Sequence, residues 1–438
     1  FKQIILFSLP IIFSNVIQSL YSTADITMLG VLVGDDAVAS VGSTSALVNL
    51  MISMFLGLSV GVNVVVSKCL GANDSEGARK TVGMSVVLSF IFGCILMAIG
   101  WFGARFFLTL MKSDQALIDS AVIYLRIYFL GSPILMLYNF LSAVMRAAGD
   151  SKRPLIFILI GGVVNVILNA LFITVFDMTV EGVAIATVVS NGISALLCAI
   201  TLIKAKGVVN LSVKYLKFFK KEFIEIVKVG VPVGVQSSLL TFSNVLIQSS
   251  VNLCGKSAVS GSSYAYQIEM YVYRAMHGIS LATTSVVSQN NGAKNYQRIK
   301  TAVLYSALTV SVLGISLSVI ATALCKPILT LVSGDSAVID YAVTRMLVAC
   351  LPYFLCGVME ILSYSLRALG KSMESVVICL FGSFVIITVW ITTVFKLYQK
   401  YALIFFAYPV SWLVTSALLL VVLLLTFKTL KEKYKNID

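Results

Sequence analysis

The chain carries little charge for its length. Only 12% of its 438 residues are Asp, Glu, Lys or Arg, whereas 59% are hydrophobic. A soluble globular protein carries about twice that share of charged residues, because its surface faces water. A soluble domain is therefore excluded, and most of the apolar residues must face something other than water.

Histidine is nearly absent, and the cysteines form no reactive pattern. The one histidine, His277, excludes a histidine cluster of the kind that holds zinc. The eight cysteines include no CxxC pair, so we expect them to pack as small apolar side chains. The sequence contains no HExxH and no Walker A motif, and we expect neither an enzyme nor an ATP-driven pump.

Long apolar stretches recur along the whole chain. Each spans roughly 20 residues, enough for a helix to cross a hydrocarbon layer of about 30 Å. Twelve are present, at residues 5–31, 43–66, 82–108, 117–144, 155–176, 182–203, 229–252, 260–287, 302–325, 337–366, 375–396 and 403–427. The sequence thus predicts an all-α membrane protein with twelve transmembrane helices.

The second half of the chain repeats the first at a constant shift of about 221 residues. Gly57-Leu58-Ser59 returns as Gly278-Ile279-Ser280, and Arg146-Ala147 returns as Arg367-Ala368. Such a duplication predicts a transporter built from two homologous six-helix lobes. Because six is an even number, both lobes enter the membrane in the same direction, and an axis along the membrane normal relates them.

The same pattern predicts four parts. An N-terminal lobe spans residues 1–203 and a C-terminal lobe spans residues 229–427. A cytoplasmic linker, residues 204–228, joins them, and residues 428–438 form a cytoplasmic tail. In the linker, apolar residues alternate with lysines, which is typical of an amphipathic segment on the inner leaflet.

The net charge of +13 marks orientation rather than nucleic-acid binding. If the N-terminus is cytoplasmic, the loops of that side hold most of the basic residues, Arg367 among them, and the linker and tail add eleven lysines. The opposite side receives only Arg105, Lys112, Lys256, Lys326, Arg345, Lys396 and Lys400. This asymmetry follows the positive-inside rule and predicts that both termini are cytoplasmic.

Ionisable residues inside membrane helices are costly, so each is a candidate functional residue. Asp25 lies in the first helix, about 14 Å from its outer edge at 1.5 Å per residue. Asn165 and Asn169 lie one turn apart on the fifth helix, and with Thr187 of the sixth they reach a similar depth. These four residues suit either Na⁺ coordination or a carboxyl group that binds H⁺. The alternative is that Asp25 only hydrogen-bonds between helices.

The second half carries different ionisable groups. Glu269, Tyr273 and His277 follow at successive i, i+4 positions on the eighth helix, on one face with Tyr266. An acidic and aromatic strip near mid-membrane suits a lipophilic cation, although it could equally serve interhelical packing. We expect His277 to be packed or hydrogen-bonded.

An acid of the second half and one proline in each half are further candidates. Glu360 in the tenth helix is either a functional acid of the second lobe or a structural one. Pro10 and Pro232 occupy matching positions in the first helix of each half, where proline removes a backbone hydrogen bond and permits a bend. A static kink is the alternative.

An ordered set of motifs resembles the multidrug and toxic compound extrusion family. It consists of Ser8-Leu9-Pro10 with Asp25, Asn165 with Asn169, Ser288-Gln289-Asn290-Asn291-Gly292-Ala293, and Leu366-Arg367-Ala368-Leu369-Gly370-Lys371-Ser372. The resemblance implies alternating access and export of organic cations or other amphipathic compounds, driven by inward Na⁺ or H⁺. It also links bending of the first helix at Pro10 to cation binding. Many members carry Asp where this chain has Asn169, which leaves Asp25 as the carboxylate of the first lobe.

These observations set the remaining expectations. No cofactor is expected, unless Na⁺ is the coupling ion at Asp25. The expected partners are small amphipathic or cationic substrates and membrane lipids, with no nucleic acid, and the protein is expected to be a monomer. We expect it in the cytoplasmic (inner) membrane of a prokaryote. The alternative function is that of a lipid-linked precursor flippase from the same superfamily.

Overall fold

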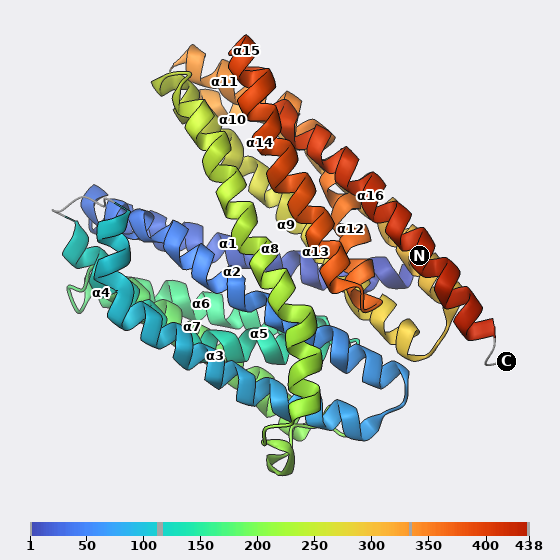
Figure 1. The fold of residues 1–438 in the computed structure, drawn as a ribbon. Coiled ribbons are helices and arrows are strands. Elements are labelled where there is room, and N and C mark those ends of the chain that lie inside the picture. The colour runs from blue at the N-terminus through green and yellow to red at the C-terminus, as the bar shows by residue number, and fades with distance from the viewer. Residues whose placement is uncertain (1, 112–116, 333–334, 436–438) are drawn as a thin grey trace. The chain divides into compact units, whose positions relative to one another are not determined.

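Helices account for nearly all of the chain in the computed structural model, which describes residues 2–111, 117–332 and 335–435 (Figure 1). Lys112 and the tail residues 436–438 lie outside the described residues. No strand occurs in the described ranges. The predicted all-α class is confirmed.

The first half forms seven helical segments: α1 (Lys2–Leu32), α2 (Asp35–Gly71), α3 (Ser75–Leu110), α4 (Ile118–Leu130), α5 (Ser132–Ala147), α6 (Lys152–Thr174) and α7 (Val180–Lys204). Segments α4 and α5 correspond to one predicted stretch and meet at a 46° bend. Gly131 and Pro133 lie at that bend, where proline suits the first turn of a new helix.

The second half adds η1 (Val213–Tyr215), α8 (Lys220–Asn252), α9 (Lys256–Gly292), α10 (Tyr296–Val332), α11 (Ser336–Arg345), η2 (Met346–Cys350), η3 (Leu351–Tyr353), α12 (Phe354–Ala368), α13 (Ser372–Leu380), η4 (Phe381–Ile386), α14 (Ile387–Trp390), η5 (Ile391–Phe395), α15 (Lys396–Tyr398) and α16 (Tyr401–Lys435). The short segments abut, so residues 336–368 and 372–398 each form one continuous span.

Each of the twelve predicted stretches lies on one helix or on one run of abutting helical segments. Among the described residues, ten spans are long and apolar enough to cross a membrane, and the bent pair of α4 and α5 makes up to eleven. The remaining predicted stretch, residues 260–287, lies on α9, which has 37 residues but is more polar than the others. Its polar residues include Glu269, Tyr273 and His277, which are site candidates.

The chain divides into two compact units. One, which we call the N-unit, is Phe13–Gly234; the other, the C-unit, is Phe1–Ile12 together with Val235–Asp438. The division falls inside α1 and inside α8, two residues after Pro10 and two residues after Pro232. The predicted lobes 1–203 and 229–427 follow the sequence repeat and not the packing of the helices, and their boundaries stay a prediction.

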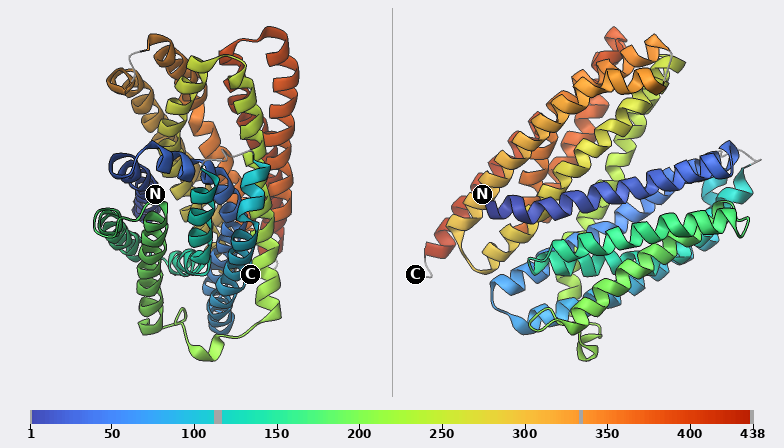
Figure 2. Two further views of the ribbon diagram at one scale, coloured as in Figure 1. Left: turned by 90° about the vertical axis from the view of Figure 1, so that its left-hand side faces the viewer. Right: turned by 180° about the vertical axis from the view of Figure 1, so that it is seen from behind.

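In the N-unit, α3 packs on α4 and α5, α5 packs on α7, and α6 packs on α7. Helices α6 and α7 run side by side in Figures 1 and 2. The largest buried side chains of this unit include Phe129, Phe140 and Met84. This packing holds α6 and α7 at a fixed register, so that one polar position on each can face α1.

Glycines allow the start of α8 to pack closely on α2 within the N-unit. A Cβ at Gly57 would meet the backbone of Gly234, and one at Gly61 would meet the carbonyl oxygen of Ile226. On α2 these two glycines are four residues apart, and α8 carries a matching pair, Gly230 and Gly234. This spacing lets membrane helices approach closely.

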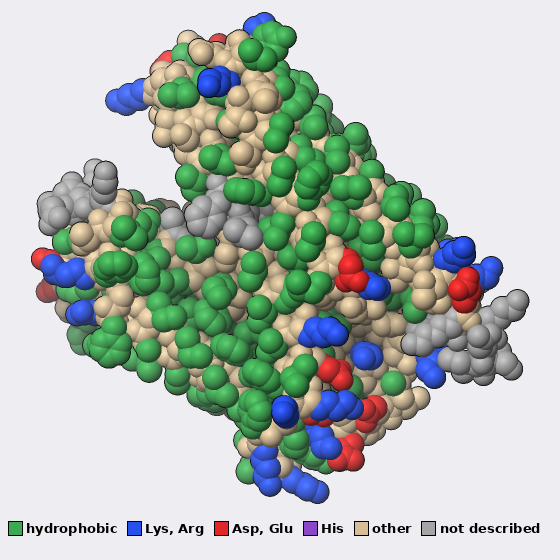
Figure 3. Space-filling model, viewed as in Figure 1, with side chains coloured by type: hydrophobic (Ala, Val, Ile, Leu, Met, Phe, Trp, Pro, Cys, Tyr) green, Lys and Arg blue, Asp and Glu red, His purple; other side chains and the backbone are tan. Residues whose placement is uncertain are grey.

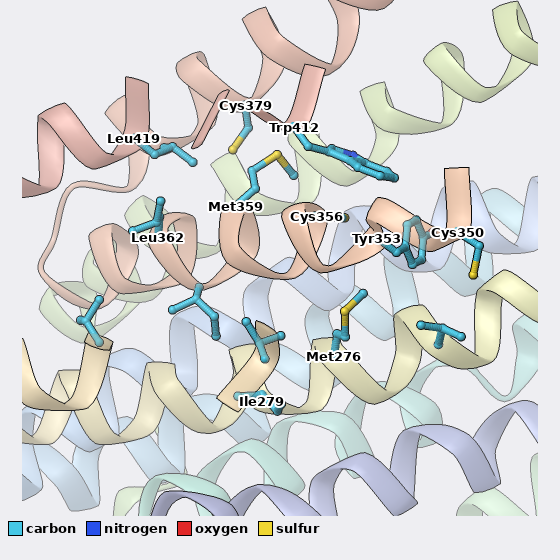
Figure 4. Packing of buried hydrophobic residues seen from close by; sticks show 14 of the residues in the cluster. Met276, Ile279, Cys350, Tyr353, Cys356, Met359, Leu362, Cys379, Trp412 and Leu419 are labelled. Carbon is cyan, nitrogen blue, oxygen red and sulfur yellow. The ribbon is translucent and has the colours of Figure 1, made fainter. Parts of the chain in front are cut away.

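In the C-unit, α12 lies between α9 on one side and α13 and α16 on the other (Figure 4). Met276 of α9 faces α12, and Trp412 and Leu419 of α16 lie on its opposite side. This placement of α12 between its neighbours brings Glu360 of α12 next to the polar residues of α9.

The linker between α7 and α8 has little helix of its own. Beyond the single short turn η1, it packs on the start of α3, where the backbone of Tyr215 lies against Gly83. The ammonium group of Lys80 lies 5.8 Å from the centre of the Phe219 ring. The linker is therefore attached to the N-unit. Figure 3 shows Lys and Arg side chains gathered around it and the start of α8, while hydrophobic side chains cover the lengths of the helices.

Candidate functional site

The four residues proposed for cation coupling meet in one cluster of the N-unit. Asp25 lies on α1, Asn165 and Asn169 lie on α6, and Thr187 lies on α7. The amide of Asn169 donates to Asp25 Oδ1 at 2.6 Å, and the hydroxyl of Thr187 lies 3.2 Å from Asp25 Oδ2. The structure thus brings together the residues that the sequence predicts to lie at a similar depth in the membrane.

A second layer of hydrogen bonds joins α6 to α7. Asn169 Nδ2 also lies 3.3 Å from Asn165 Oδ1, and Asn165 Nδ2 lies 3.5 Å from Thr187 Oγ1. The Thr187 hydroxyl also lies 2.9 Å from the carbonyl oxygen of Val183, so its one proton points either to that carbonyl or to Asp25. A change at the Asp25 carboxylate therefore alters contacts with both helices.

The Asp25 carboxylate is buried without a cationic side chain. Only 8% of the residue is exposed, and in the described ranges its neighbours within ion-pair distance include no Lys, Arg or His. The Oδ1 atom of Asn169 is also buried and accepts no hydrogen bond from any residue that the structure describes. A buried carboxylate needs a compensating partner, so this cluster suits a bound proton or a hard monovalent cation.

Asp25 supplies one carboxylate to this cluster, and its hydrogen-bonding neighbours are neutral amides and a hydroxyl. The described residues contain no group of three or more His, Cys, Asp or Glu side chains that could hold a metal ion. One carboxylate among neutral oxygens suits Na⁺ or H⁺, and binding of either ion stays a prediction.

Close packing of α1 on α6 positions Asp25. A Cβ at Gly162 would overlap the ring of Tyr21, which lies one turn before Asp25 on α1. The Tyr21 hydroxyl also donates to the carbonyl oxygen of Ile158 on α6. Gly162 lies between Ile158 and Asn165 on the same helix, so the tyrosine and the aspartate contact adjacent turns of α6.

The acidic strip predicted on α9 separates into two clusters in the C-unit. Glu269 forms a bidentate ion pair with Arg345 of α11, at 3.0 Å to Nε and 2.7 Å to Nη2. Arg345 also donates to Ser262 at 2.7 Å, and its guanidinium lies over the rings of Tyr266 and Phe405. The negative charge of Glu269 is therefore already neutralised inside the protein.

Arg345 is buried, with only 4% of the residue exposed. The carboxylate of Glu269 on a neighbouring helix compensates its guanidinium. The sequence offered a signal for this burial, because Arg345 falls inside the apolar stretch 337–366. Its position on the outer side of the membrane stays a prediction.

Glu360 forms the second cluster. Its carboxylate accepts from the hydroxyl of Tyr273 at 2.9 Å and of Ser280 at 3.0 Å, and His277 Nδ1 lies 3.2 Å from Oε2. The rings of Tyr273 and His277 stack with centres 5.6 Å apart. His277 is hydrogen-bonded, as expected, and its side chain remains about a quarter exposed, at 26%.

Arg367 is a polar residue near this cluster that sequence reasoning did not select. It was assigned to a cytoplasmic loop, but only 2% of it is exposed. It donates to Gln236 Oε1 at 2.6 Å and lies 4.4 Å from the centre of the Tyr364 ring. Its Nε is buried and donates to no acceptor within the described part of the chain. The loop assignment was wrong because α12 continues to Ala368.

Pro10 and Pro232 both lie inside continuous helices, α1 and α8. Bending at either position stays a prediction.

The sequence Gly57-Leu58-Ser59-Val60-Gly61 matches a hydrolase GxSxG pattern, but it lies in the middle of α2. The Ser59 hydroxyl donates to the carbonyl oxygen of Leu56 at 2.7 Å, so it does not stand on the strand-to-helix turn that such a nucleophile needs.

Comparisons with known proteins agree with this architecture. A family model described as MatE matches residues 10–171 and, separately, residues 232–393. Probable multidrug resistance protein YpnP of Bacillus subtilis is 33% identical over 298 residues, which are 68% of this chain and 66% of that protein. Probable multidrug resistance protein YoeA of the same organism is 27% identical over 388 residues, 87% of this chain and 84% of that protein.

A solved structure described as a crystal structure of MATE in the bent conformation has the same fold. Its TM-score is 0.91 at 21% identity, over 99% of this chain and 97% of that one. The two separate matches to one family model also confirm the duplication read from the sequence.

Proposed function

Because this chain belongs to the MatE family, we propose that it is a secondary active multidrug exporter that exchanges amphipathic or cationic compounds for Na⁺ or H⁺. The observation that carries the proposal is the buried Asp25 carboxylate, which no cationic side chain compensates among the described residues. The curated relatives named for multidrug resistance support the substrate class.

The coupling step starts with neutralisation of Asp25. With the carboxylate ionised, Asn169 donates to one of its oxygens and the Thr187 hydroxyl turns from the carbonyl oxygen of Val183 to donate to the other, and this holds α1 to α6 and α7. A bound proton or Na⁺ removes the need for these donors. The proton binds to the Asp25 carboxylate itself, and the Oδ1 atom of Asn169, which accepts no hydrogen bond from the described residues, is an oxygen that can accept one from the protonated acid or coordinate Na⁺.

Release of these hydrogen bonds frees α1 to change shape. Pro10 interrupts the hydrogen-bond ladder of α1, and Pro232 does the same in α8. We assign the bend that accompanies ion binding to Pro10 and a corresponding hinge to Pro232. Bending thereby converts an electrostatic event at Asp25 into a movement of a helix.

Substrate binding is assigned to the polar residues of α9 and α12. Glu360 supplies the negative charge for a lipophilic cation, and Tyr273 and Tyr266 supply aromatic faces. Glu269 contributes by holding Arg345 in place, because its own charge is already paired. This assignment keeps the four residues of the predicted site but gives them different roles.

The chain is a multi-pass membrane protein with bacterial homologues. We place it as a monomer in the cytoplasmic membrane of a prokaryote with both termini inside, as the lysine distribution favours. The multidrug-resistance relatives favour drug export over flipping of lipid-linked precursors. A flippase would instead bind lipid-linked pyrophosphates and ignore organic cations.

Efflux from proteoliposomes tests the proposal. A fluorescent organic cation is loaded, and a Na⁺ gradient or a pH gradient is imposed separately. We expect efflux under one of the two gradients, and that gradient identifies the coupling ion. An absence of efflux under both, with folded and oriented protein, would overturn the assignment.

A further inference from the structure

A cavity of about 660 Å³ lies at one end of the N-unit, away from the cluster around Asp25. It forms where α5 ends, α6 begins and α7 runs into the linker. This is the end that carries the basic linker, which the lysine distribution predicts to be cytoplasmic. The cavity takes no part in the transport site proposed above.

The lining of this cavity is amphipathic. Apolar side chains form much of its wall: Met145, Phe157, Ile200, Leu202 and Val209. Four charged residues also line it: Asp150, Arg153, Lys204 and Lys206.

The charges of the cavity leave an excess of positive charge. Asp150 is paired with Arg153 at 3.4 Å. Lys204 and Lys206 are exposed, and in the part of the chain that the structure describes no carboxylate lies within ion-pair distance of either. Two ammonium groups are therefore available to a ligand at the cavity.

The linker is folded so that these two lysines stay at the cavity. The side-chain amide of Asn210 donates to the carbonyl oxygens of Ile203 and Ala205, at 2.8 Å each. The backbone N–H of Leu211 returns to the carbonyl oxygen of Leu202 at 3.0 Å. These bonds fold the linker back over the end of α7 and fix the position of the segment that lines the cavity.

An apolar surface continues from the cavity along the same helices. Ile156 and Ile160 of α6 are exposed, as are Leu196 and Ile203 of α7. Ile156 and Ile203 adjoin the lining residues Phe157 and Lys204 in the chain. In a membrane protein, such surface faces acyl chains, so a ligand with a charged head and apolar tails matches both parts.

The duplicated half lacks this arrangement. At the repeat shift, Asp150 and Arg153 correspond to Lys371 and Glu374, which pair at 2.7 Å with the charges reversed. Lys204 corresponds to the apolar Leu425, within α16, which continues to Lys435 without a fold-back. The two available lysines are therefore a feature of the N-unit and not of the repeat.

We propose that this cavity binds the phosphate head group of an anionic phospholipid of the cytoplasmic leaflet, with Lys204 and Lys206 holding the phosphate. The apolar wall accommodates the glycerol and the start of the acyl chains. Basic pockets at the cytoplasmic ends of membrane helices are suited to such head groups. The bound lipid fixes the start of the linker against α6 and α7.

Native mass spectrometry of the full chain in detergent micelles tests this binding. The probe is phosphatidylglycerol, compared with phosphatidylcholine of the same acyl chains and with inorganic phosphate. Each lysine near an anionic head group contributes about 1 kcal/mol, so Lys204→Gln combined with Lys206→Gln weakens binding roughly 30-fold. Lys204→Arg with Lys206→Arg retains it.

Two controls separate this site from general attraction of lipid to a basic linker. Lys217→Gln with Lys220→Gln removes the same charge from linker residues outside the cavity lining and leaves binding within about threefold of wild type. Ala148→Phe keeps every charge but fills the cavity, and it weakens phosphatidylglycerol binding. Size-exclusion chromatography confirms that each variant is folded.

Three results would overturn the proposal. Equal losses in the two glutamine pairs would show attraction without a site. Phosphatidylcholine binding as tightly as phosphatidylglycerol would show that the anionic charge is not recognised. Displacement of the lipid by inorganic phosphate at similar concentration would assign the cavity to a soluble phosphate instead.

Discussion

Asn169 on α6 donates a hydrogen bond of 2.6 Å to the carboxylate of Asp25 on α1. The same amide group holds an Oδ1 atom that is buried and accepts nothing. One side chain thus stabilises the ionised carboxylate and offers a free oxygen to the ion that would neutralise it. In the proposed coupling step, Asn169 is the residue through which neutralisation of Asp25 reaches α6.

Replacing Asn169 tests that role. Asn169→Ala removes a hydrogen bond to a charged group, which is worth about 1.5 to 3 kcal/mol, and we expect ion-driven efflux to fall by at least about tenfold. Asn169→Asp adds an oxygen ligand and a second acid, and we expect it to retain gradient-driven efflux with a changed dependence on pH. Transport assays in proteoliposomes measure both. Wild-type efflux by Asn169→Ala would contradict the role.

Gly162 is expected to control the approach of α1 to α6. Gly162→Ala places a Cβ against the ring of Tyr21, and overpacking of this kind costs about 1 to 3 kcal/mol. We expect lower thermal stability and weaker efflux, because Asp25 lies one turn from Tyr21. Gly192→Ala on α7 is the matched control, since its Cβ would meet only Ile134 at 3.7 Å. Equal behaviour of the two variants would refute the packing argument.

The Glu269–Arg345 ion pair is expected to stabilise the C-unit without carrying substrate charge. Glu269→Gln or Arg345→Met leaves a buried charge without its partner and destabilises the protein by about 3 to 5 kcal/mol. The double variant Glu269→Gln with Arg345→Met leaves no such charge and recovers most of the loss. Thermal unfolding of purified protein measures this. If the double variant were as unstable as the sum of the single ones, the pair would not be acting as a unit.

Glu360 is expected to attract the cationic substrate. Glu360→Gln preserves the shape and removes the charge beside Tyr273 and His277, so we expect the Kd for an organic cation to rise by about tenfold, with neutral amphipathic compounds unaffected. Binding titrations of both ligand types measure the difference. Glu374→Gln at an exposed surface pair is the control. Unchanged cation binding and transport would leave Glu360 with a structural role.

The cluster around Asp25 was predictable because a helix rises by a fixed distance per residue. Counting residues from the ends of three apolar stretches placed Asp25, Asn169 and Thr187 at one depth, and all three are in contact through hydrogen bonds. The twelve helical stretches and the duplication were predictable for a similar reason, since hydrophobic length and repeat spacing are properties of the sequence alone.

The partners of Glu269 were not predictable in this way. Depth says nothing about the rotation of one helix relative to another, and Arg345 reaches Glu269 only through the packing of α11 on α9. The attachment of the start of α8 to α2 likewise depends on close backbone contact at Gly57 and Gly234, which spacing suggests but does not establish.

The most direct test of the account is ion-driven efflux of a fluorescent organic cation from proteoliposomes containing wild-type protein or Asp25→Asn. The substitution keeps the size of the side chain and removes the charge that the coupling ion neutralises. The account predicts that the variant folds, binds the fluorescent cation and shows no efflux under either a Na⁺ or a pH gradient. Gradient-driven efflux by Asp25→Asn at the wild-type rate would contradict it.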